Sequence, residues 1–169
     1  MAERWGQAAP DAVPTRIGQV VMLHHAGDRE EARRRLLDLW AEIGEHGDPL
    51  HRCTLAHYLA DTQDDPADEL AWDLRALTAA QEAAGELPAG HGDALAARVL
   101  YPSLHLNLAA DYVKLGQREA ARTHLRWARG AAHALADDTY GDRVRAAIRT
   151  LESRLGGSGG AWEPPRQRP

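Results

Sequence analysis

Apolar residues recur along this chain at the spacing of one face of an α-helix, in successive segments broken by Gly, Asp and Pro. The clearest face follows an i, i+4, i+7, i+8, i+11 pattern and consists of Ala32, Leu36, Leu39, Trp40 and Ile43. The 169 residues include 32 Ala and 21 Leu, which favour helices, whereas Ile and Val together contribute nine and Phe is absent. The sequence therefore predicts an all-α fold.

The helical segments, seven or eight in number, group into three pairs and a final helix. We expect one helical domain over residues 15–155, preceded by a flexible arm at 1–14 and followed by a disordered Gly/Pro-rich tail at 156–169. The expected pairs cover about 16–43, 49–84 and 93–136, with a capping helix at 139–155. Pro102 lacks an amide proton and is expected to kink or restart the helix that contains it.

One segment of about 25 residues resembles a tetratricopeptide repeat, a helix–turn–helix unit with small, large and aromatic residues at set positions. Those positions hold Leu108, Ala109, Tyr112, Gly116, Ala121, Leu125 and Ala128. Weaker copies precede it at Val20 to Leu39 and at Leu55 to Leu77. The resemblance implies antiparallel helix pairs stacked as a short right-handed solenoid of about three degenerate repeats, closed by the final helix as a cap.

The same resemblance implies a concave groove lined by the first helix of each pair. Solenoid grooves bind extended or helical peptides, so the implied function is an adaptor or scaffold that binds a protein or peptide partner. On this alignment the groove residues are His24, His25, Cys53, His57, Asp61, Val113 and Lys114. This hypothesis includes no catalytic residue, metal or cofactor.

An alternative hypothesis is a small-molecule or metal-dependent enzyme. Cys53, His57 and Asp61 lie at i, i+4 and i+8 on one helical stripe, and zinc accepts all three ligand types, while a Cys beside a His can also be a nucleophile. The stripe spans about 12 Å, however, which is too long for one ion to contact all three side chains. Tyr101 and His105 share a face beside Pro102 and form a second candidate pocket, although His105 also fits as a packed core residue. Common enzyme motifs such as HExxH, CxxC and a Gly-rich phosphate loop are absent from the sequence.

A third hypothesis, a structural homo-oligomer, rests on the distribution of charge. Residues 61–73 carry six carboxylates and no basic residue, whereas residues 114–129 carry five basic residues against Glu119. These surfaces of two copies are complementary and would form a homodimer, unless both are simply solvated. The formal net charge of −5 disfavours nucleic acid as a partner.

The location of the protein follows from what the sequence lacks. No apolar run approaches the length of about 20 residues that spans a bilayer, and the first 14 residues do not have the pattern of a secretory signal. The single cysteine has no partner for an internal disulfide. We therefore expect a cytoplasmic protein without a membrane partner.

Overall fold

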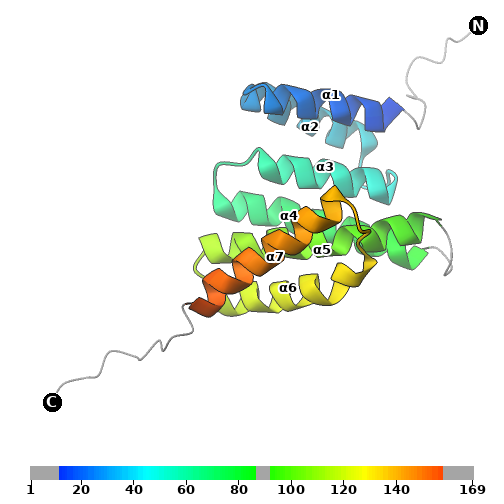
Figure 1. Ribbon diagram of the computed structural model, residues 1–169. Coiled ribbons are helices and arrows are strands. Elements are labelled where there is room, and N and C mark those ends of the chain that lie inside the picture. Colours follow the sequence, from blue (N-terminus) through cyan, green and yellow to red (C-terminus); the bar gives the residue numbers. More distant parts are fainter. Residues whose placement is uncertain (1–11, 87–91, 158–169) are drawn as a thin grey trace, which may run out of the picture. The chain divides into compact units, whose positions relative to one another are not determined.

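The computed structural model describes residues 12–86 and 92–157 (Figure 1). In this part of the chain there are seven α-helices and one short 3-10 helix, η1, which confirms the predicted all-α fold. The elements are α1 (Ala12–His25), α2 (Arg29–Ile43), α3 (Pro49–Asp61), α4 (Pro66–Glu86), α5 (Gly92–Lys114), α6 (Arg118–Ala131), η1 (Ala132–Ala134) and α7 (Thr139–Gly157). None of these helices is long and apolar enough to cross a membrane.

The chain divides into two compact units, Met1–Ala97 and Arg98–Pro169, with the division inside α5. In unit 1 the helices pack in sequence, α1 on α2, α2 on α3 and α3 on α4, in antiparallel-like pairs, and α1 also contacts α3 (Figure 1). The buried side chains of the first three helices form one apolar cluster, as their spacing predicts. Its members are Ile17, Val20, Ala32, Leu36, Leu39, Leu55 and Leu59.

The turn between α2 and α3 is determined by local sequence. Gly44 adopts a φ of +67°, a left-handed conformation that glycine takes without a steric penalty. Gly47 lies so close to Ile43 that an added Cβ would stand 2.9 Å from its carbonyl oxygen. The carboxylate of Asp48 then accepts hydrogen bonds from the amides of Leu50, at 2.9 Å, and His51, at 3.2 Å, with Pro49 at the first helical position. The start of α3 is therefore where Asp48 and Pro49 predict it.

The turn between α3 and α4 is held by two arginines of α2. Arg33 donates to the backbone carbonyl of Thr62 from Nε, at 3.1 Å, and from Nη2, at 2.6 Å, and Arg29 donates to the same carbonyl from Nε at 3.1 Å. Both guanidinium groups also pair with Asp64, at 2.9 Å for Arg29 and 3.1 Å for Arg33. Because Thr62 is buried, these cations supply the donors that the end of α3 requires. We call this arrangement the arginine clamp.

Arg33→Ala is expected to lower the free energy of unfolding by about 1.5–3 kcal/mol, because a buried carbonyl loses charged donors. The matched control is Arg34→Ala. It removes an arginine that is 70% exposed and that, among the described residues, pairs with Glu31 alone, so its expected cost is below about 0.5 kcal/mol. Chemical denaturation of both variants measures the difference. Equal losses for the two would contradict the role assigned to the clamp.

Unit 2 contains α5 from Arg98 onward, α6, η1 and α7. Ala109, Ala121 and Ala128 are fully buried, and these small residues allow close approach of the helices, as the sequence predicts. One face of α7, with apolar residues at i, i+4, i+7 and i+11 from Val144, is also buried and joins the same cluster. The cluster consists of Ala109, Ala121, Leu125, Ala128, Leu135, Val144, Ile148, Leu151 and Leu155.

Two boundaries differ from those expected. The helix that contains Pro102 is continuous over Gly92–Lys114 and does not restart at the proline, which is fully buried. The loss of one helical hydrogen bond at a proline is a local cost, and burial of the ring offsets it. Helix α1 begins at Ala12, so the last three residues of the expected arm are helical. The rest of the arm, most of the expected tail and residues 87–91 lie outside the described residues.

Candidate functional site

The predicted imidazole and carboxylate of α3 lie close together in unit 1. His57 Nε2 is 4.0 Å from Asp61 Oδ2, and its Nδ1 is 3.8 Å from Oδ1 of Asp73, a buried residue of α4 that the sequence analysis did not select. Burial lowers the pKa of His57, but the contacts with Asp73 and Asp61 outweigh it, and the pKa is raised. Burial raises the pKa of Asp61 against the smaller opposing charges of His57 and of His24 on α1. The structure thus brings His57 and Asp61 together and adds Asp73 to them.

Cys53 belongs to the core beneath this group. Its side chain is 1% exposed, and burial, with the charge of Asp73, raises the pKa of its thiol to about 12. Nucleophilic attack requires the thiolate, which a buried thiol with this pKa does not supply at neutral pH. The physical chemistry of Cys53 therefore favours packing over catalysis.

The other predicted groove residues lie at helix ends. His24 and His25 form the last turn of α1, with ring centroids 6.0 Å apart, and His25 is exposed. Val113 and Lys114 end α5 and belong to unit 2. That these residues and the α3 group line one groove stays a prediction.

The predicted pair Tyr101 and His105 is part of a larger cluster of rings in unit 2. The ring centroids of Tyr101 and His105 are 6.2 Å apart, and His105 Nδ1 lies 3.1 Å from Nδ1 of His124 on α6. His124 stacks on Tyr112, and the ring of Trp127 meets both imidazoles edge-on at 5.4 and 5.0 Å. Burial, with the charge of His124, lowers the pKa of His105 to about 4, and burial also lowers the pKa of His124. Both imidazoles are therefore neutral at neutral pH and pack as aromatic rings.

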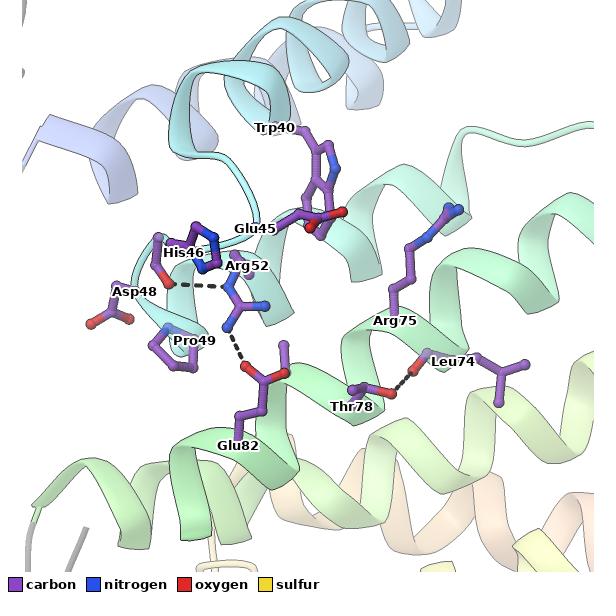
Figure 2. A pocket seen from close by; sticks show the side chains of 12 residues that line it. Trp40, Glu45, His46, Asp48, Pro49, Arg52, Leu74, Arg75, Thr78 and Glu82 are labelled. Carbon is purple, nitrogen blue, oxygen red and sulfur yellow. Dashed lines mark hydrogen bonds and ion pairs between the residues drawn. The ribbon is translucent and has the colours of Figure 1, made fainter. Parts of the chain in front are cut away.

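A cleft of about 760 Å³ opens on unit 1 between the end of α2, the following turn and α4 (Figure 2). Its volume lies in the range of ligand-binding pockets. None of the residues selected from the sequence as groove or pocket residues contributes to it. The lining residues are Trp40, Glu45, His46, Gly47, Asp48, Pro49, Arg52, Leu74, Arg75, Thr78, Ala79 and Glu82.

Part of the polar lining of the cleft is held in place by contacts within the protein. Arg52, whose side chain is 12% exposed, donates from Nε to the carbonyl of Gly47 at 3.0 Å and pairs with Glu82 of α4 (Figure 2). The hydroxyl of Thr78 donates to the carbonyl of Leu74 at 3.0 Å. The Arg52–Glu82 pair joins α3 to α4 and forms a wall of the cleft whose charges largely cancel.

A second set of side chains in the cleft is available to a ligand. Arg75 lies with Cζ 4.3 Å from the centre of the Trp72 ring, and Trp72 meets Trp40 edge-to-face at 5.2 Å. Leu74 is 39% exposed. Within residues 12–86 and 92–157 the exposed Arg75 has no ion-pair partner, although the ring of Trp72 orients it. The cleft therefore combines apolar surface with an oriented and unpaired cation.

Comparison with known proteins identifies no family for the chain. No family model matches it, and no curated protein or solved structure is significantly similar to it. The described residues form an all-helical protein of seven helices packed in sequential pairs.

Proposed function

We propose that this protein is an adaptor that binds a peptide segment of a protein partner, and that the α2–α4 cleft of unit 1 receives the segment. The observation that carries the proposal is the composition of the cleft, in which exposed Leu74 and the Trp40 ring adjoin the unpaired guanidinium of Arg75 and the carboxylate of Glu45. A peptide presents apolar side chains together with backbone donors and acceptors, so it satisfies such a mixed surface.

The balance of charge in the cleft favours a peptide over a strongly anionic small molecule. Arg52 and Arg75 face Glu45, Asp48 and Glu82, so the lining carries no net positive charge. A nucleotide or other polyphosphate would meet these carboxylates and lose affinity. The tetratricopeptide-like pattern of residues 107–128 supports the same class of function, because stacked helix pairs typically present extended surfaces for protein binding.

Selection of random displayed peptides on the immobilised protein, followed by fluorescence anisotropy with the enriched sequences, tests the proposal. Arg75→Glu reverses the unpaired cation and Thr78→Arg places a long side chain in the cleft. Both residues are exposed, so the fold is expected to persist. Each variant is expected to weaken peptide binding by about tenfold or more, which corresponds to about 1.4 kcal/mol.

The matched control for the cleft is Arg143→Glu, which makes the same charge change at an exposed position of α7 and should leave binding unchanged. A third variant, His25→Ala, tests the groove predicted from the sequence. Loss of binding in His25→Ala alone would move the site to that groove. Wild-type affinity in both cleft variants, or the absence of any enriched peptide, would overturn the assignment to the cleft.

A further inference from the structure

A separate surface of unit 2 follows the contact between α6 and α7. One hollow of about 410 Å³ and a second of about 190 Å³ both include Glu152, so they adjoin along the two helices. The first is lined by Arg122, Leu125, Arg126, Glu152, Leu155 and Gly156, and the second by Arg129, Ala132, Arg145, Ile148, Arg149 and Glu152. We call the two hollows together the α6–α7 groove.

The floor of the groove is apolar. Leu125 and Leu155 in the first hollow, and Ile148 in the second, belong to the buried core of unit 2. Apolar side chains of a ligand that entered the hollows would therefore cover core residues and leave water. The two hollows are separate, which suits a ligand with apolar side chains at two points along its length.

The rim of the groove is strongly basic, with five arginines and one carboxylate. Three of the arginines are neutralised, since Arg122 pairs with Glu119, Arg129 pairs with Glu152 at 2.7 Å, and Arg145 lies 3.4 Å from Asp142. The other two are Arg126, whose side chain donates to the Thr123 hydroxyl at 3.2 Å, and Arg149.

Arg126 and Arg149 are both exposed, and neither pairs with a carboxylate of the part of the chain that the structure describes. Each hollow thus has one cation free to bind an anion. Each hollow therefore combines an apolar floor with one arginine that is available to an anionic group of a ligand.

We propose that the α6–α7 groove binds an acidic peptide segment of another protein, with apolar side chains in the two hollows and carboxylates against Arg126 and Arg149. Charge complementarity selects an acidic ligand, and the apolar floor selects a peptide with interspersed apolar residues. This surface belongs to unit 2, so the proposal is independent of the α2–α4 cleft.

A second copy of this chain fits the groove less well than another protein does. The acidic stretch at residues 61–73 is the sequence-predicted partner for this basic surface. Asp64 of that stretch is already held by Arg29 and Arg33, and Asp73 is buried. The other four carboxylates lie at the end of α3, in the following turn and in the first turns of α4, without an alternating apolar pattern.

The probe for the test is the fluorescein-labelled peptide EELLEELLEE, titrated with the full chain and followed by anisotropy. Wild type is expected to bind it saturably, and the Arg126→Glu/Arg149→Glu double variant is expected to bind at least about tenfold more weakly. The matched control, Arg98→Glu/Arg143→Glu, makes the same charge change at exposed positions of unit 2 and is expected to retain wild-type affinity. Arg75→Glu is also expected to retain it, which separates this surface from the cleft.

Further measurements could overturn the proposal. The peptide EESSEESSEE keeps the charge but removes the apolar residues, and equal binding of this peptide would show general charge attraction and overturn the groove. Equal losses in the two double variants would do the same. Sedimentation of the protein alone completes the test, because a wild-type dimer that dissociates only in Arg126→Glu/Arg149→Glu would assign the surface to a second copy and overturn the proposal.

Discussion

Leu36→Ala is expected to lower the free energy of unfolding by about 2–5 kcal/mol. Leu36 lies in the core of unit 1, where its side chain is 1% exposed and packs in the cluster with Leu39 and Leu59. The substitution removes buried methyl groups and leaves a cavity that the rigid helices refill only in part. Because domains of this size are stable by only about 5–15 kcal/mol, the loss would be a large share of the total.

The matched control for Leu36 is its neighbour in sequence. Leu37→Ala removes the same atoms from a side chain that is 41% exposed, so its expected cost is well under about 1 kcal/mol. Urea denaturation followed by far-UV circular dichroism measures both variants. If the urea midpoints of the two variants decreased by the same amount, the assignment of this face of α2 to the core would be wrong.

Acidification from pH 6.5 to pH 4 is expected to destabilise unit 2 through His105. The pKa of His105 falls from 6.5 to about 4 because burial disfavours the charged imidazole, so the unfolded chain binds more protons in this range. The contribution of the neutral His105 to the free energy of unfolding is therefore fully present above pH 6.5, and it is lost as the pH falls toward 4. The shift corresponds to roughly 3 kcal/mol at most, and solvent screening of the half-buried ring reduces the expected effect to about 1–2 kcal/mol.

His105→Gln keeps a hydrogen-bonding side chain but removes the titration, so it should flatten the dependence of unfolding free energy on pH over this range. Fluorescence of Trp127, which contacts both imidazoles, provides a local signal. His57→Gln is the comparison, because His57 is expected to change the free energy of unfolding with pH in the opposite direction. The raised pKa of His57 contributes stability that is present below pH 6.5 and lost as the pH rises through the folded value. An unchanged slope in His105→Gln would exclude His105 as its cause.

Local patterns in the sequence were enough to predict the helices. The spacing of Ala32, Leu36 and Leu39 indicates which face of α2 is buried, and Asp48 with Pro49 marks the start of α3. Both signals act between residues a few positions apart. Pro102 shows the limit of such rules, because its place inside a continuous helix depends on tertiary packing.

The candidate sites were less predictable because they join residues that are distant in sequence. The periodicity predicts Trp40 and Leu74 as core residues, but both line the cleft. Periodicity indicates that a face is apolar, and it does not indicate where the neighbouring helices leave that face uncovered. The partner of His105 is His124, which lies on a different helix. The only local signal for the cleft was the i, i+3 spacing of Trp72 and Arg75 on α4, which places a cation beside an aromatic ring.

The burial of Cys53 has a practical consequence. It is the only cysteine in the chain, and a thiol that is 1% exposed with a pKa of about 12 is shielded from alkylating reagents in the native state. Modification requires an opening of α3, so the rate of alkylation under native conditions reports the free energy of that opening. A cysteine introduced on the surface can therefore carry a dye while the native thiol stays in place as an internal sensor of local unfolding.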